Sequence, residues 1–321
     1  MIYLNENNIK KIGIQWDETV NVINDTVKCL GNNDFAQPIK PYLRYRNIKN
    51  RIIAMPAFAG GDFNIAGIKW IASFPDNINK GIPRAHSIVI LNNADTGEPM
   101  AIINTALLSI IRTASVSGLI IKYFDKIRKL NNANIGIIGF GPIGQYHLKM
   151  CSELFSNQIS QFFLYDIKGI NESVIDENLK SKVTVCKTWQ EAYTDADIFI
   201  TCTVSEDRYI DKRPKSSSLH LNVSLRDYKP NVFDWFKDSI FVDDWEEVCR
   251  ENTDIERMHK EKGLLEGNVK NIVDFITEDS LASYDKNVPI MFNPMGMAIF
   301  DVSLCSYYLQ KSKLLNIGTI L

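Results

Sequence analysis

The chain has 321 residues, and its 36 basic against 38 acidic residues give a formal net charge of −2 at neutral pH. Hydrophobic residues make up 45% and charged residues 23%, which is typical of soluble globular proteins and excludes disordered, collagen-like and coiled-coil classes. The balanced charge argues against a nucleic-acid binder, which needs an excess of clustered cations. At about 150 residues per domain, the length predicts two domains.

Cysteines and histidines are scattered along the chain without metal-ligand spacing, so we expect no metal site. The N-terminal segment lacks the basic start and apolar core of a signal peptide. No apolar run approaches the roughly 20 residues of a membrane span. We therefore expect a cytoplasmic protein with reduced thiols and no membrane partner.

The first hundred residues read as mixed helix and strand. Apolar residues at helical spacing predict a helix over residues 17–30, with Asp17 as its cap. Turn-forming segments then separate short apolar runs, which predict an antiparallel meander with strands at 51–57, 66–72, 87–91 and 99–103. A long buried or amphipathic helix is expected over 105–123.

From residue 134 the pattern changes to alternating strand and helix. Helices are expected at 142–155 and 188–195, between strands at 134–139, 161–166, 183–186, 197–203, 219–224 and 239–243. This alternation predicts a parallel sheet with helices on both faces. A charged, solvated helix follows at about 252–262, and helical spacing returns over 295–314.

The strongest local motif is NIGIIGFGPIG at 134–144, in which Gly139, Gly141 and Gly144 form G-x-G-x-x-G between a strand and a helix. Such glycines permit a tight turn, approach of a pyrophosphate and close helix packing. The next strand ends in Asp166, about 20 residues after the last glycine, where a carboxylate accepts ribose hydroxyls and repels a 2′-phosphate. We predict NAD rather than NADP, against the alternative of a glycine-rich turn without cofactor.

The run TCT at 201–203 follows a central strand of the predicted sheet. Thr201, Cys202 and Thr203 would lie at its carboxyl end, where this fold binds ligands, so we expect them to line the cofactor. For Cys202 we favour a packed thiol over a nucleophile.

Three cations stand in apolar or turn-rich settings: Arg44, Lys69 and Arg112. Taken singly, each is explained by an edge position or by a side chain that reaches solvent. Together they predict a pocket that binds carboxylates. Arg84 and Arg51 are weaker candidates for the same role.

Asp227 follows the predicted strand at 219–224 and would stand beside the nicotinamide. A carboxylate there suits proton transfer to an amine or to attacking water, although an ordinary turn residue explains it equally well. Lys69 is the second candidate for this proton transfer.

The segments RIIAMPA, GIKW, LLSIIRTAS, TCTVS and NPMGMAIFD extend over essentially the whole chain. With the glycine motif, they resemble the ornithine cyclodeaminase/mu-crystallin family. The resemblance implies that Asp227 is catalytic and that substrate contacts come from Arg44, Lys69, Arg112, Arg84 and Met55. It implies NAD contacts from Arg112, Thr113, Gly139, Phe140, Gly141, Pro142, Ile143, Gly144, Asp166, Thr201, Cys202, Thr203 and Ser224.

The resemblance also implies an α/β fold in which a Rossmann-type domain (114–292) is inserted into an α+β domain for substrate binding and dimerisation (1–113 with 293–321). Homodimers whose N-terminal strands close an interface are typical of the family. VDDW and NPMGMAIFD favour members that form 2,3-diaminopropionate. The implied reaction is NAD-dependent oxidation of N-(2-amino-2-carboxyethyl)-L-glutamate, an anionic amino acid, for a siderophore or peptide product. Ornithine cyclodeaminase, an alanine-dehydrogenase-like enzyme and a non-enzymatic crystallin-like protein remain alternatives.

Overall fold

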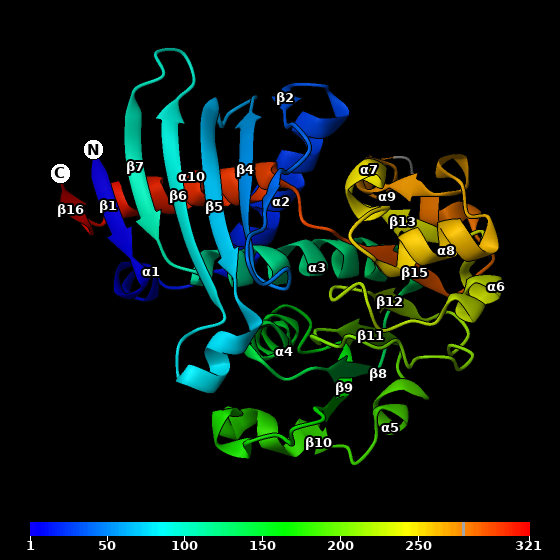
Figure 1. Cartoon of the computed structure of the whole chain (residues 1–321). Coiled ribbons are helices and arrows are strands. Elements are labelled where there is room, and N and C mark those ends of the chain that lie inside the picture. The colour runs from blue at the N-terminus through cyan, green and yellow to red at the C-terminus, as the bar shows by residue number, and fades with distance from the viewer. Residues whose placement is uncertain (278–279) are drawn as a thin grey trace. The chain divides into compact units, whose positions relative to one another are not determined.

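The computed structural model describes residues 1–277 and 280–321 (Figure 1). The chain divides into two compact units. The first combines Met1–Ser115 with Gly296–Leu321, and the second is Val116–Met295. The second unit is thus inserted between two segments of the first.

The first unit is built on a mixed sheet with the strand order β16-β1-β7-β6-β5-β4-β2, in which β3 also pairs with β4. Its centre is the predicted antiparallel meander, formed by β4 (Arg51–Ala59), β5 (Ile65–Ser73), β6 (Ala85–Asn93) and β7 (Pro99–Asn104). Short strands complete it: β1 (Ile2–Asn5), β2 (Phe35–Ala36), β3 (Tyr42–Leu43) and β16 (Thr319–Ile320).

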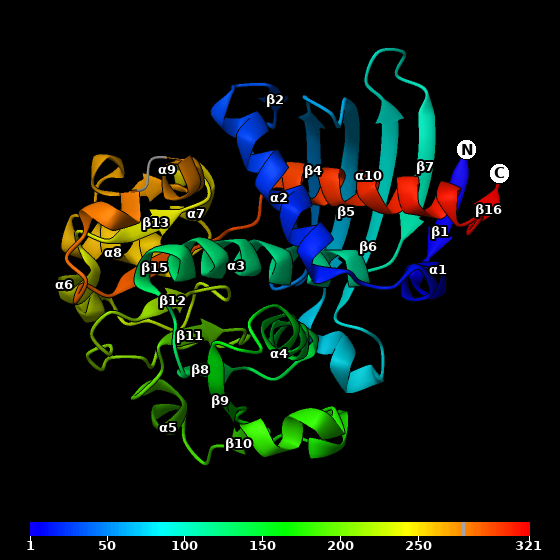
Figure 2. The ribbon, with the colours of Figure 1, turned by 180° about the vertical axis from the view of Figure 1, so that it is seen from behind.

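One face of this sheet is covered by helices α10 (Ala298–Leu314) and α2 (Trp16–Gly31), as Figure 2 shows. Side chains alternate along each strand, so that Met55, Lys69 and Val89 stand opposite one another on adjacent strands and are buried. A lysine therefore lies in the centre of an otherwise apolar face.

The opposite face of the sheet carries a row of apolar residues, Pro56, Ile68, Ile90 and Ile102, that pair across four strands. All four are only partly buried, and the nearby Trp70 is 41% exposed. Over its described residues, the first unit therefore leaves this apolar sheet face uncovered.

The helix predicted from residue 17 begins one residue earlier. Trp16 is buried and starts α2, so Asp17 is not its cap; Gln15 holds that position and makes no side-chain capping bond. Asp17 instead lies in the first turn, where its charge favours the helix dipole. The preceding helix α1 (Glu6–Ile12) has a capping box between Asn5 and Asn8.

Helix α3 (Leu107–Arg128) begins in the first unit and continues into the second. Contrary to the sequence-based expectation, it is long and apolar enough to cross a membrane. However, 72% of its most apolar window is buried inside the protein, which is the behaviour of a core helix.

The second unit has a parallel sheet with the strand order β10-β9-β8-β11-β12-β15-β13-β14. The strands are β8 (Ala133–Ile138), β9 (Ile159–Tyr165), β10 (Val183–Val185), β11 (Ile198–Thr201), β12 (Leu219–Leu221), β13 (Ile240–Val242), β14 (Lys270–Asn271) and β15 (Ile290–Asn293). The six predicted strands are confirmed, several of them shorter than expected. β15, which lies between β12 and β13, was not predicted.

Helices pack on both faces of this sheet. A Cβ built on Gly136 of β8 would lie 1.9 Å from the carbonyl of Ala192 in α5 (Trp189–Tyr193). On the other face, Gly144 of α4 (Pro142–Leu154) lies against Ile137. The remaining helices are α6 (Phe233–Phe236), α7 (Trp245–Val248), α8 (Asp254–Lys262) and α9 (Ile272–Thr277), and 3-10 turns are formed by Pro75–Lys80, Glu172–Val174, Glu177–Lys182, Pro230–Val232, Glu266–Asn268 and Ser280–Ser283.

Candidate active site

The three motif glycines in the second unit have different surroundings. Gly139 has a φ of +83°, and a Cβ on it would lie 2.5 Å from the backbone of Cys202. A Cβ on Gly144 would lie 2.2 Å from the Gly139 carbonyl oxygen, whereas a Cβ on Gly141 would meet nothing within 4 Å. The first and third glycines therefore permit close packing, and the second faces open space that can admit a phosphate.

Gly141 is also the N-cap of α4, where no side chain caps the helix and Pro142 takes the first position. Ile143 follows in the first turn, and the buried Phe140 precedes the cap. The first N–H groups of a helix have no partner within it and attract anions. This turn therefore fits a dinucleotide pyrophosphate.

Asp166 follows β9 and binds the glycine turn. Its Oδ2 accepts the Phe140 N–H at 2.7 Å, and its Oδ1 accepts the Lys168 N–H at 2.9 Å. Each carboxylate oxygen has a further lone pair, so ribose hydroxyls can still be bound.

Asp227 is fully buried in the second unit and is surrounded by hydroxyl groups. Thr203 donates to its Oδ1 at 2.5 Å, Ser224 donates to its Oδ2, and the hydroxyl of Tyr209 is also hydrogen-bonded to it. Ser224 donates to Thr201 as well, at 2.7 Å. Residues expected at the cofactor thus form one polar network with the expected acid–base residue.

Asp254, which the sequence reasoning missed, organises the loop that carries Asp227. Its Oδ2 accepts the backbone N–H groups of Asp227 and Tyr228, each at 3.1 Å, and its Oδ1 pairs with Arg208 at 2.6 Å. Burial raises the pKa of Asp254 to about 6, against the opposing effect of Arg208.

In the first unit, two of the predicted cations meet on one carboxylate. Lys69 Nζ and Arg112 Nε lie 2.9 and 3.1 Å from the same oxygen, Oδ1 of Asp301 on α10. All three residues are buried. Asp301 was also missed, and its only local signal is a carboxylate inside the apolar helix AIFDVSL.

The burial of this cluster changes its protonation. Desolvation, helped by Arg112, lowers the pKa of Lys69 to about 8 despite the neighbouring Asp301. Burial alone would raise the pKa of Asp301, but Arg112 and Lys69 outweigh it and hold that pKa below its usual value. Lys69 can therefore gain or lose a proton near neutral pH.

The other predicted substrate residues have different settings. Met55 is buried directly opposite Lys69. Arg44 is exposed and stacks over the Tyr42 ring at 4.9 Å, and Arg51 lies 5.8 Å from the same ring. Arg84 is partly buried.

Two predicted cofactor residues have local partners. The Thr113 hydroxyl donates to the Ser109 carbonyl within α3, at 2.7 Å. Cys202 is half-buried, and burial, helped by Asp227, raises the pKa of its thiol well above the ordinary value, which favours the expected packed thiol over a nucleophile.

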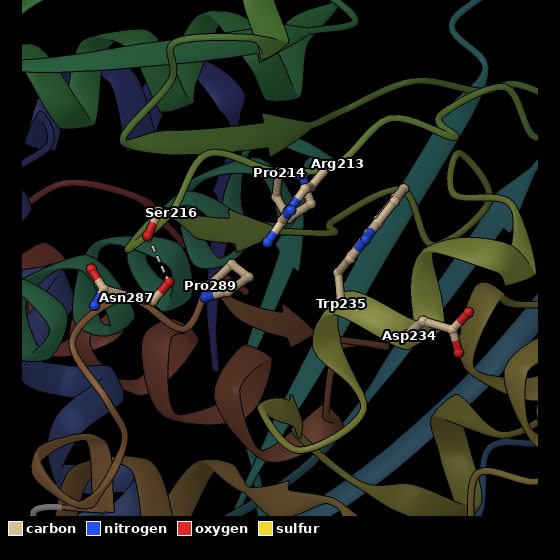
Figure 3. A pocket seen from close by; sticks show the side chains of 7 residues that line it. All are labelled: Arg213, Pro214, Ser216, Asp234, Trp235, Asn287 and Pro289. Atoms are coloured by element: carbon tan, nitrogen blue, oxygen red, sulfur yellow. Dashed lines mark hydrogen bonds between the residues drawn. The ribbon is translucent and has the colours of Figure 1, made fainter.

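A separate pocket of about 350 Å³ in the second unit contains none of these residues. Figure 3 shows its lining, in which Asp234 points away from the indole of Trp235 and Ser216 donates to the Asn287 carbonyl at 2.9 Å. Over residues 1–277 and 280–321 no group of three or more His, Cys, Asp or Glu side chains is arranged to hold a metal ion.

Comparison with known proteins shows the family of the chain. The sequence profile of the ornithine cyclodeaminase/mu-crystallin family matches residues 9–313. The chain belongs to this family. It is 34% identical over 335 aligned positions to N-((2S)-2-amino-2-carboxyethyl)-L-glutamate dehydrogenase from Staphylococcus aureus, covering 100% of this chain and 98% of the relative.

Two solved structures share the fold. The Δ1-pyrroline-2-carboxylate reductase of Thermococcus litoralis, in complex with NADH and L-proline, has a TM-score of 0.87 at 21% identity over 100% of both chains. An archaeal alanine dehydrogenase dimer with bound NAD has a TM-score of 0.84 at 21% identity, over 99% of this chain and 98% of the other. Family and fold are thus those that the sequence motifs indicated.

Proposed function

We propose that this family member is an NAD-dependent oxidoreductase that cleaves N-((2S)-2-amino-2-carboxyethyl)-L-glutamate to 2-oxoglutarate and L-2,3-diaminopropionate. The observation that carries the substrate is the full-length identity of 34% to the dehydrogenase named for that compound. The product would supply a siderophore or peptide natural product made in the cytoplasm.

The use of NAD rests on the second unit. Gly141 leaves room for a pyrophosphate at the start of α4, and Asp166 offers a carboxylate that favours a free ribose over a 2′-phosphate. Two structural neighbours are described with NADH or NAD bound. Bound NAD+ supplies the hydride acceptor for the Cα–H of the glutamate moiety.

Substrate binding falls to Lys69 and Arg112 in the first unit. The substrate carries three carboxylates, and a buried cation pair binds one of them strongly because few water molecules compete. Arg44, Arg84 and Met55 complete the proposed contacts. Fixing the carboxylates orients the glutamate Cα–H and replaces a random encounter by a positioned one.

Proton transfer falls to Asp227. A proton must leave the secondary amine so that its lone pair can expel the hydride and form an imine, and hydrolysis of this imine then requires an activated water molecule. The hydroxyls of Thr203, Ser224 and Tyr209 connect the buried Asp227 carboxylate to less buried positions, so they can relay that proton. Lys69 remains the second candidate because its pKa of about 8 permits the same role.

Three alternative functions predict other outcomes. An alanine-dehydrogenase-like enzyme would form NADH from alanine. An ornithine cyclodeaminase would form proline and ammonia without net NADH, and a crystallin-like nucleotide binder would do no chemistry. The buried Asp227 network weighs against the crystallin-like binder, since a protein that only binds a nucleotide does not need this network.

Parallel incubations distinguish these readings. Purified protein and NAD+ are mixed with the synthetic glutamate adduct, with ornithine or with alanine. The proposal predicts NADH and 2-oxoglutarate from the adduct alone. Proline without NADH from ornithine, or no turnover with any substrate, would overturn it. Asp227→Ala should abolish turnover while NAD still binds; retained turnover would transfer the proton role to Lys69.

A further inference from the structure

We propose that Asp301 is a positioning residue that holds Lys69 and Arg112 as one carboxylate-binding pair through a single shared oxygen. This inference rests on the proposed function for its kinetic consequences. The geometry itself does not depend on the substrate's identity, because its contacts join residues of the first unit to one another and not to a ligand.

The shared oxygen leaves the other donors of both cations available. Lys69 uses one Nζ–H on Oδ1 of Asp301, and Arg112 uses its Nε–H on the same atom. Asp301 therefore engages neither Nη1 nor Nη2 of Arg112, whose shared edge faces Gly296, and it leaves two protons of Lys69 for other acceptors. Two parallel N–H groups on one edge match the two oxygens of a carboxylate.

The backbone near Asp301 supports the same arrangement. Gly296 precedes α10 with a φ of +89°, and a Cβ built on it would lie 2.9 Å from Nη1 and 3.1 Å from Nη2 of Arg112. The carbonyl of Gly296 accepts from Lys40 Nζ at 2.8 Å. The segment that leads into α10 thus lies close to the guanidinium, and a side chain at residue 296 would press on it.

The positive charges of Lys69 and Arg112 explain why the carboxylate of Asp301 lies between them. Lys69 and Arg112 without an anion would place two adjacent positive charges in a buried site, which favours a neutral lysine. With Asp301 the protonated cluster carries one net positive charge, enough to attract a substrate carboxylate. The other titratable groups near the cluster are Cys305 on α10 and Lys40.

Asp301 Oδ2 is buried and has no hydrogen-bond partner among residues 1–277 and 280–321. An unpartnered carboxylate oxygen is costly in a protein interior, so a purely structural role is a poor explanation for it. The cost is offset if the carboxylate keeps Lys69 protonated and Arg112 aligned for binding.

The test follows Lys69 directly in the full-length protein. Lysines are labelled with carbon-13 and nitrogen-15, the Lys69 Cε–Nζ signal is assigned by its loss in Lys69→Arg, and its titration is compared between wild type and Asp301→Asn. We expect a midpoint near pH 8 in the wild type. In Asp301→Asn it should fall by about 1–3 pH units, because an opposite charge in contact is lost.

The binding of carboxylate ligands should weaken together with the Lys69 pKa in Asp301→Asn. At pH 7.5 the affinity for 2-oxoglutarate, and the KM for the adduct, should weaken about tenfold or more in Asp301→Asn, since charge-assisted contacts are lost. An unchanged Lys69 titration in this variant would overturn the proposal even if turnover fell. If the adduct is not the substrate, the titration and 2-oxoglutarate binding still decide the role of Asp301.

Two further variants separate positioning from general stability. Asp197→Asn removes a carboxylate from an ion pair with Lys215 in the second unit and should leave the Lys69 titration unchanged. Asp301→Glu keeps the charge but moves the oxygen by one methylene. In Asp301→Glu the Lys69 titration should retain its midpoint near pH 8, while the KM for the adduct should still rise. An unaltered KM would contradict the positioning role, and this comparison remains possible if Asp301→Asn does not fold.

Discussion

Gly296 and Gly263 both have a positive φ, of +89° and +75°, but different surroundings. A Cβ on Gly296 would press on the Arg112 guanidinium, whereas one on Gly263 would meet nothing within 4 Å. Alanine at either position should lower the free energy of unfolding by about 1–2 kcal/mol through backbone strain. Only Gly296→Ala should also raise KM severalfold, as initial-rate kinetics would show. Equal KM values in the two variants would contradict the proposed Arg112 contact.

Asp166 determines the predicted cofactor preference. Asp166→Ser should weaken NAD binding by about tenfold or more, because charged hydrogen bonds to ribose are lost, and should improve NADP use. Asp166→Asn is the matched control, since it keeps an acceptor for the Phe140 N–H. Dissociation constants for both cofactors measure the effect. A Ser variant with unaltered preference would exclude Asp166 as the ribose ligand.

Residue type and spacing were enough to single out some of the residues that the structure brings together. Lys69 and Arg112 were picked out because cations are unusual in apolar segments, and the glycine motif has a fixed spacing. Asp301 was missed because its partner Lys69 lies 232 residues away, and Asp254 because its role is to hold another loop. Such partners are set by tertiary packing, which local sequence does not encode.

The contact between α3 and α4 contains His147. Its Nδ1 is hydrogen-bonded to the Ile143 carbonyl and its Nε2 to the Ser117 hydroxyl, each at 2.8 Å. Burial lowers the pKa of His147 to about 4. In the unfolded chain a histidine is protonated at about pH 6.5. The contribution of His147 to the free energy of unfolding is therefore fully present above that pH and is lost as the pH falls towards 4.

Between pH 7 and pH 5 this histidine should account for about 2 kcal/mol of lost stability. His147→Gln should lose that part of the pH dependence, as urea unfolding at both pH values would measure. The exposed His86→Gln serves as the control and should behave like the wild type. A His147→Gln variant with the full wild-type pH dependence would contradict the prediction.

At the scale of elements, periodicity identified most of the two sheets but not all of their members. The meander and the alternating strands have continuous apolar patterns, so they were found. β16 is a short edge strand whose pairing with β1 joins the two ends of the chain, and β15 lies between strands that precede it in sequence. Their existence depends on partners that are distant in the chain.

The uncovered sheet face of the first unit supports a homodimer, as proposed from the family. Ile90 lies in the middle of the apolar row with Ile68 and Ile102. Ile90→Lys would place a charge there and should convert a dimer into monomers, which sedimentation equilibrium would show. Leu265→Lys changes an exposed leucine in the second unit and should stay dimeric. A dimeric Ile90→Lys variant would rule out this face.

The whole molecule is proposed to remove a hydride from the glutamate part of its substrate, and isotope transfer tests this most directly. The synthetic adduct is deuterated at the glutamate Cα and incubated with the protein and NAD+. We expect deuterium on the nicotinamide ring of NADH, with one 2-oxoglutarate and one unlabelled 2,3-diaminopropionate formed per NADH. Unlabelled NADH, or cleavage of the adduct without NADH, would contradict it.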